Sequence, residues 1–185
     1  MPKKGQVLVD ESSGNIYEFI ETAADTGGER ITIRMTLNKK GKVAPDHIHV
    51  LQQETFKVLS GRMTYLLNGE KNYLQAGESI VLPKNQPHNH YNTAEEPLVL
   101  EQVIEPAFDT DFFIENLIGM TSDGKVKNGQ TSFLQSMVTV RYMEAPSFLA
   151  NIPRAPQKVL VAIFGPIARL LGYRAFYKKY TGIEK

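Results

Sequence analysis

The feature that most constrains the fold is the short alternation of apolar and polar residues through the first hundred positions. Arg30 to Leu37 is the clearest case, because its apolar side chains fall on one face of a strand and its polar ones on the other. Asn68-Gly69 separates two further alternating runs and predicts a type I′ hairpin, since both residues tolerate positive φ. Further strands are predicted near residues 6–9, 16–21, 55–59, 79–82 and 97–104. Many short strands separated by turns indicate an all-β sandwich or barrel.

After Glu105-Pro106 the apolar spacing changes to a helical period. A helix is predicted around residues 113–118, with Asp109 and Asp111 placed to cap its start. A second helix is predicted around 133–138, ending before 145–146. A third is predicted over 157–180, kinked or broken at Gly165-Pro166. The expected organisation is therefore a β-barrel domain over 1–105 and a helical extension over 106–185 that packs on the barrel or on a partner subunit.

Composition restricts the partners and the chemistry. The chain has no cysteine, so a metal could be held only by nitrogen and oxygen atoms. Its formal charge of +1 gives no reason to expect a nucleic acid partner, although seven basic residues and one acidic residue follow position 150. This basic segment has the composition of a nucleic-acid or membrane-surface face, but an apolar helix side docked on the barrel or on a partner subunit is favoured. The apolar run 159–171 is too short to span a membrane, and without an apolar leader at the start a cytoplasmic location is expected.

All four histidines lie between positions 47 and 90. His47 and His49 have the same parity in a strand and can place two imidazoles around one centre. Glu54 has the wrong parity, so a bend over Val50 to Gln53 is predicted to return its carboxylate to that face. His88 would add a third imidazole from across the barrel. Such a set suits Fe, Mn, Ni, Co, Cu or Zn better than Ca or Mg. The alternative is an exposed polar pair beside a surface carboxylate.

The glycines around these residues complete a pattern that resembles the cupin family. Its first motif is matched by Gly41, His47, His49, Glu54 and Gly61, and its second by Gly77, Pro83, Asn85, His88 and Asn92. Asn85 departs from the usual glycine, a mild change because asparagine also enters the left-handed region. The short segment between the motifs is similar to that of small single-domain cupins, and the resemblance covers residues 3–105 but not the helical segment. It implies a mainly β double-stranded β-helix, or jelly roll, followed by helices, with one divalent transition metal held by His47, His49, Glu54 and His88.

The resemblance indicates which residues form a metal site, but it leaves the reaction open. It favours a metal-dependent enzyme acting on a small organic molecule, with oxygen-dependent oxidation like that of quercetin-dioxygenase-like cupins. The alternatives are a cupin isomerase or decarboxylase, and a non-catalytic metal- and small-molecule-binding or interaction protein. His90 shares the parity of His88, so it is a candidate proton shuttle or substrate contact, although a hydrogen-bonding or partly exposed barrel histidine is the favoured interpretation. A homodimer is expected from the resemblance alone.

Overall fold

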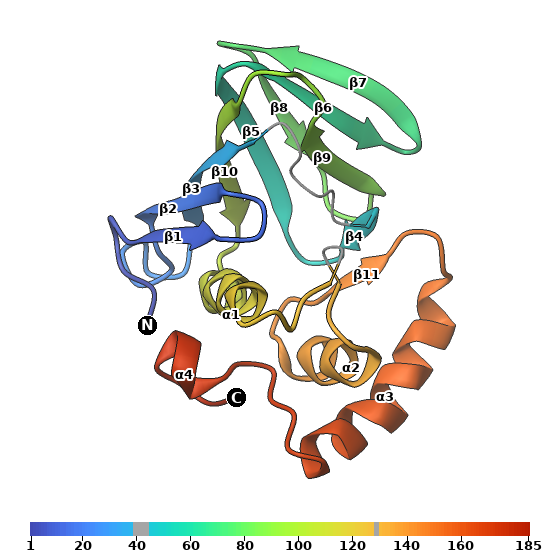
Figure 1. The fold of residues 1–185 in the computed structure, drawn as a ribbon. Helices are drawn as coiled ribbons and strands as arrows, with labels where there is room; N and C mark the ends of the chain where they lie inside the picture. The colour runs from blue at the N-terminus through green and yellow to red at the C-terminus, as the bar shows by residue number, and fades with distance from the viewer. Residues whose placement is uncertain (39–44, 128–129) are drawn as a thin grey trace.

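The computed structural model describes residues 1–38, 45–127 and 130–185, and it contains two facing antiparallel sheets with helices at one end (Figure 1). Gly41 of the first motif lies outside these residues. The first sheet has the order β1 (Val7–Asp10), β2 (Asn15–Glu21), β3 (Ile31–Leu37), β10 (Leu98–Glu105), β5 (Gln53–Ser60) and β8 (Ser79–Leu82). The second has the order β11 (Ser147–Leu149), β4 (His47–His49), β9 (His88–Asn92), β6 (Arg62–Leu67) and β7 (Glu70–Gln75). The predicted mainly β, double-stranded β-helix fold with C-terminal helices is confirmed.

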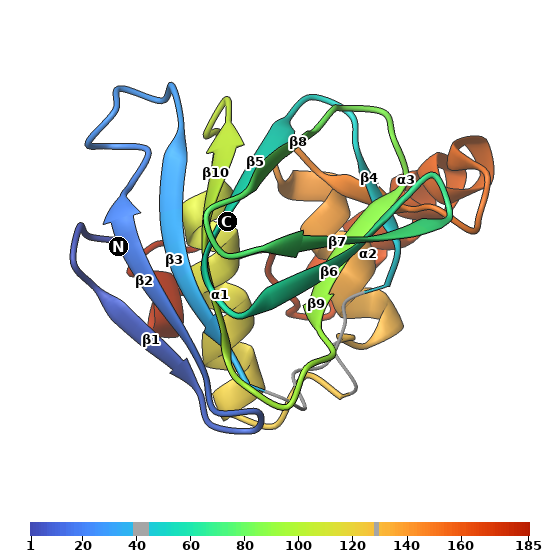
Figure 2. The same ribbon diagram turned by 90° about the horizontal axis from the view of Figure 1, so that it is seen from above.

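The core lies between the two sheets, where the alternation of the strands places apolar side chains (Figure 2). On β3 the four apolar residues are buried, while Arg34 on the other face pairs with Glu18 and Glu101. Phe56 of β5 and Leu100 of β10 are fully buried beside them. The predicted hairpin is also confirmed, since the turn between β6 and β7 has φ of 53° at Asn68 and 83° at Gly69.

Within the described residues four helices follow β10, namely α1 (Thr110–Ser122), α2 (Phe133–Tyr142), α3 (Arg154–Leu170) and α4 (Lys178–Thr181), with β11 between α2 and α3. Of the predicted kink or break at Gly165-Pro166, the break is wrong, because α3 continues through Pro166, and the predicted extent to residue 180 is also wrong, because α3 ends at Leu170. Pro166 deprives only the carbonyl of Ala162 of its helical partner, and both residues are exposed, so water can replace that bond. No helix in the described ranges is long and apolar enough to cross a membrane.

Asp109 does not cap α1 as the sequence predicts. It occupies the cap position, but its carboxylate instead accepts hydrogen bonds from the Glu144 backbone N–H at 3.1 Å and from the Lys185 Nζ at 2.7 Å. Asp111 lies in the first turn and accepts from the N–H groups of Ala23 and Phe112. Both carboxylates therefore tie α1 to its surroundings.

The short strand β11 is a feature that the sequence analysis missed. It pairs antiparallel with β4, with Ser147 opposite His49 and Leu149 opposite His47. A segment far along the chain thus supports the strand that carries two of the candidate ligands. The division at residue 105 stays a prediction.

Candidate metal centre

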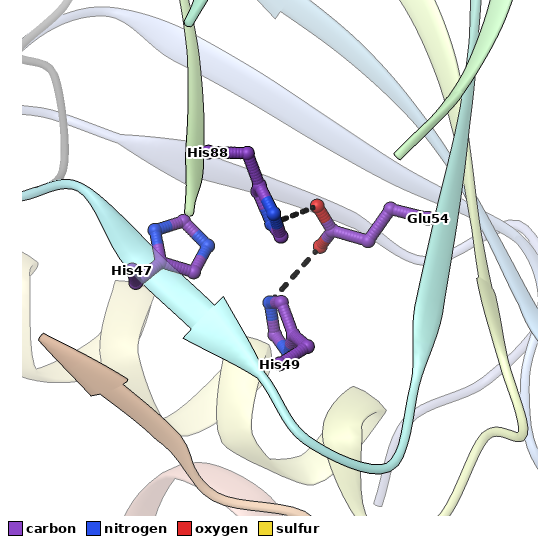
Figure 3. A group of neighbouring side chains, drawn as sticks. All are labelled: His47, His49, Glu54 and His88. Atoms are coloured by element: carbon purple, nitrogen blue, oxygen red, sulfur yellow. Dashed lines mark ion pairs between the residues drawn. The ribbon is translucent and has the colours of Figure 1, made fainter. Parts of the chain in front are cut away.

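Three strands bring the four predicted ligands together (Figure 3). His47 and His49 lie on β4, and His47 is paired in register with His88 of the neighbouring β9. The chain then bends over Val50 to Gln52 and enters β5, so that Glu54 faces the histidines from the opposite sheet. The predicted bend is confirmed.

The separations within the cluster suit a single ion. Glu54 lies between two imidazoles, with Oε1 3.3 Å from His49 Nε2 and Oε2 3.1 Å from His88 Nε2. One donor atom from each of the four residues lies within 4.8 Å of every other. Neighbouring ligands at right angles around an ion, with bonds of about 2.1 Å, are about 3 Å apart. The four side chains are therefore close to the spacing of a coordination sphere.

Backbone carbonyls orient two of the histidines. His47 Nδ1 lies 3.0 Å from the Pro45 oxygen, and His88 Nδ1 lies 2.8 Å from the Gln86 oxygen. A carbonyl only accepts hydrogen bonds, so each Nδ1 carries the hydrogen and each Nε2 keeps its lone pair. This is the tautomer in which Nε2 can bind a metal.

Gln102 orients the carboxylate, and the sequence analysis did not single it out. Its Nε2 donates a hydrogen bond of 2.8 Å to Glu54 Oε1. Gln102 occupies an inward position of β10, in the series that Leu98, Leu100 and Ile104 fill with apolar side chains. This polar residue in an otherwise apolar series of strand positions could have predicted a role for Gln102 in the site.

The charges of the cluster are unusual for so buried a place. Burial opposes ionisation of Glu54, but the close contacts with His49 and His88 outweigh it and hold the pKa of Glu54 well below its usual value. Burial also opposes charge on His88, yet the contact with Glu54 and its negative charge raise the pKa of His88. Burial lowers the pKa of His47 to about 4 despite the charge of Glu54. A charged carboxylate thus faces a neutral imidazole from His47.

The unsatisfied atoms of the cluster fit a metal ion. Glu54 Oε2 and His88 Nε2 are buried, and neither has a hydrogen bond of acceptable geometry. Lone pairs turned toward one another in a buried site are costly without a cation between them. Nitrogen and carboxylate donors without any thiolate suit a divalent transition metal. The residues present therefore could hold such an ion.

A cavity of about 210 Å³ adjoins this cluster inside the barrel. Its walls include the inward side chains of β3 and, from α1, Ile114, Leu117 and Ile118. Gln102 lines the cavity and also contacts Glu54, so it connects the cavity to the ligand cluster. None of the four candidate ligands lines this cavity itself, and none lines a more open hollow of about 450 Å³ elsewhere on the barrel.

His90 lies on the cavity side of the cluster and outside the four-residue group. Its ring centre is 4.4 Å from that of Phe56, and its Nδ1 is buried without a hydrogen-bond partner. Burial lowers the pKa of His90 to about 4. The inward orientation predicted for His90 is confirmed. Asn92, farther along β9, donates to the carbonyls of Leu37 and Glu96, which is a structural role.

Comparison with known proteins agrees with the motifs. Residues 33–104 match the Cupin domain family, and an uncharacterized protein of Aquifex aeolicus is 31% identical over 55% of this chain and 81% of its own length. Residues 33–104 of the chain form a cupin domain. The family match ends before α1, as the sequence resemblance does.

Longer similarities extend beyond the cupin domain. A probable oxidoreductase, virH, of Hypocrea virens is 27% identical over 95% of this chain and 86% of its own length, so the helical segment has a counterpart there. Gentisate 1,2 dioxygenase 1 of Aquipseudomonas alcaligenes is 30% identical over 58% of this chain but only 33% of that protein. The solved structure of KdgF from Halomonas sp. has 19% identity and a TM-score of 0.47, and covers 57% of this chain and 89% of its own.

Proposed function

We propose that this cupin is a metal-dependent oxidoreductase that uses dioxygen to oxidise a small organic molecule in the barrel cavity. The observation that carries the proposal is the convergence of His47, His49, Glu54 and His88 from three strands. A bound divalent transition metal, whether Fe, Mn, Ni, Co, Cu or Zn, would supply Lewis-acid or redox chemistry there. Four protein ligands would leave two positions of an octahedral ion open, which is typical of catalytic rather than structural metal sites.

The relatives support the reaction class. One is named a probable oxidoreductase and aligns with nearly the whole chain, and another is named a gentisate dioxygenase and aligns with part of it. Neither name specifies a substrate for this protein, so the cavity must supply that information.

The cavity favours a small, uncharged, largely apolar substrate. No lysine, arginine, aspartate or glutamate is among the described residues that line it, so a charged substrate would lose its hydration without a countercharge. Its volume of about 210 Å³ is below the usual range for drug-sized ligands and suits a molecule of about one ring. We assign His90 the role of substrate contact, because its unpaired Nδ1 and its low pKa leave a neutral imidazole at the cavity wall.

The first experiment is elemental analysis of protein purified without chelator or nickel resin. Oxygen uptake is then measured with flavonols, diketones and hydroxylated aromatics after loading with each candidate metal. We expect one metal to support uptake, His47→Ala and His88→Ala to abolish it, and His90→Asn to keep the metal while slowing turnover.

The outcomes distinguish the oxidoreductase from the alternative functions of the site. Turnover that continues without oxygen would assign the site to an isomerase or decarboxylase. Metal retention with no turnover of any tested compound would leave a non-catalytic binding cupin. A homodimer and a cytoplasmic location stay predictions, to be checked by solution mass and by localisation of the full chain.

A further inference from the structure

Helix α3 packs on the molecule with its smallest residues. Its buried positions are Val161, Gly165 and Ala168, which recur at intervals of four and three and so share one face. A Cβ added to Gly165 would lie 2.6 Å from the Cβ of Arg141 on α2, so the glycine permits the close approach of the two helices. The side toward α2 therefore holds little of the helix's apolar surface.

The large apolar residues of α3 point to solvent instead. Leu160, Ile163, Ile167 and Leu170 follow at helical intervals and are 39%, 52%, 42% and 88% exposed. Val159 and Leu171 widen the same face and are 57% and 64% exposed. We define these six residues as the outer face of α3. A contiguous apolar face of this kind marks a site of interaction.

The charges around the outer face indicate the partner. Helix α3 contains three basic residues and no acidic residue, whereas Arg174 and Lys179 farther along the chain pair with Glu184 and Asp123. On α3 itself Arg154, Lys158 and Arg169 are exposed, and none has a carboxylate partner among the described residues. Two copies of the chain joined through this face would bring like charges together, because a twofold contact repeats the same surface. An anionic lipid surface would attract them.

The position of the most exposed residues favours lipid over a flat protein contact. Leu170 and Leu171 lie at the end of α3, and Figure 1 places that end at the periphery of the molecule, away from the barrel. Arg169 precedes them and lies over the ring of Tyr142 at 4.6 Å. Apolar side chains flanked by arginine and tyrosine are typical of groups at the boundary between headgroups and acyl chains.

We propose that α3 docks the protein on anionic membrane surfaces, lying in the plane of the bilayer with its outer face inserted. Its 17 residues give a length of about 25 Å along the surface. The polar face, with Lys158 and Arg169, stays among the headgroups or in water, as in interfacial amphipathic helices. This docking is independent of the metal centre and of the reaction proposed for it.

Vesicle sedimentation of the full chain tests the proposal. The probes are vesicles of phosphatidylcholine alone and of phosphatidylcholine mixed with phosphatidylglycerol. We expect binding to the anionic vesicles only, and its loss at about 1 M salt, where the screening length falls to about 3 Å. Leu170→Ser with Leu171→Ser should weaken binding by roughly tenfold or more, since both side chains lose their apolar contact with lipid.

A matched pair of exposed apolar residues on the barrel provides the control. Val7 and Val9 of β1 are 54% and 46% exposed and lie outside the metal centre, so Val7→Ser with Val9→Ser removes exposed apolar surface elsewhere and should leave vesicle binding unchanged. Circular dichroism and metal content should be the same for both double variants. Equal loss of binding in the two would overturn the proposal.

The oligomeric state in solution supplies the other decisive result. A dimer that the Leu170 and Leu171 substitutions dissociate, with no vesicle binding by the original chain, would assign the outer face to a second copy and overturn the membrane proposal. A monomer that binds neither vesicle type would also overturn it. Anionic vesicle binding by the original chain, lost on these substitutions, supports it.

Discussion

The metal centre and the outer face of α3 both invert the ordinary distribution of polar and apolar residues, in opposite directions. At the centre, Glu54 and His88 are 3% and 1% exposed, whereas Leu170 on α3 is 88% exposed. Buried ionisable groups and exposed large apolar groups each cost free energy unless something else binds them. Both features therefore support the two proposed partners of opposite chemistry, a cation inside and an apolar phase outside. Function is expected at sites that depart from the packing rules that the rest of the fold follows, with polar groups exposed and apolar groups buried.

Removal of a ligand should have the largest effect. His88→Ala deletes the imidazole that meets Glu54 at 3.1 Å, and we expect metal affinity to fall by more than about 100-fold, beyond the loss typical of outer-shell changes. His90→Asn is the matched control, because His90 has the same parity on β9 but lies outside the cluster. Competition titration with a chromophoric chelator measures both. Equal losses in the two variants would contradict the assignment of the four ligands.

The pH dependence should be the next largest effect. A proton on His88 competes with the metal, and because contact with Glu54 raises the pKa of His88, this competition begins at a higher pH than for an ordinary histidine. Below that pKa, affinity should fall about tenfold for each pH unit. The contacts with His49 and His88 hold the pKa of Glu54 well below its usual value, and His47, with a pKa of about 4, adds a second proton only near that pH.

Titration calorimetry in buffers of different ionisation enthalpy should detect the proton that His88 releases on metal binding. Affinity should be greatest above the pKa of His88 and lowest toward pH 4. A constant affinity from about pH 8 to about pH 5 would be incompatible with imidazole ligands.

A smaller effect should follow from the residue that orients the carboxylate. Gln102→Met removes the hydrogen bond to Glu54 Oε1, and we expect a 10- to 100-fold loss of metal affinity at about equal side-chain volume. Gln52→Met is the control, since Gln52 is equally buried but donates to Pro106, Ala107 and Thr110. That control should lower the free energy of unfolding without weakening the metal site. If both variants bind metal as the original chain does, Gln102 is not a positioning residue.

The packing side of α3 can be tested separately from its outer face. Gly165→Val places a side chain against Arg141, and overpacking of this kind costs about 1–3 kcal/mol of unfolding free energy. Ala162→Val on the same helix is exposed and should cost only about 0.5 kcal/mol through helix propensity. Urea unfolding compares the two. Equal costs would mean that α3 does not pack closely on α2.

The two regions differ in how much of them the sequence could predict. The positions of His47, His49 and Glu54 follow from strand parity and a local bend, which short-range spacing encodes. Gln102 and β11 were missed because their partners, Glu54 and β4, lie far away along the chain. For α3 the apolar period predicts a helix, but it does not reveal which face packs, since that depends on the space left beside Arg141.

The smallest effect is expected at Asn85, which connects the two regions. Its backbone N–H donates to the His49 carbonyl at 2.7 Å, and its Oδ1 accepts from Arg154 Nη1 of α3 at 3.1 Å. Because φ is 66°, Asn85→Gly fits the backbone and loses only an exposed hydrogen bond, so stability should change by about 0.5 kcal/mol or less. Asn85→Ala should cost about 1–2 kcal/mol, because alanine is strained in the left-handed region.

Thermal unfolding and metal titration of both Asn85 variants complete this test. Metal affinity should be unchanged in Asn85→Gly, since the backbone bond to His49 survives and the side chain contacts no ligand. A tenfold loss in that variant would show that the contact with Arg154 holds the β4 strand in place, and the metal centre and α3 would then be coupled rather than independent. The asparagine that stands where cupins usually have glycine would in that case be a connection between the two regions rather than a neutral replacement.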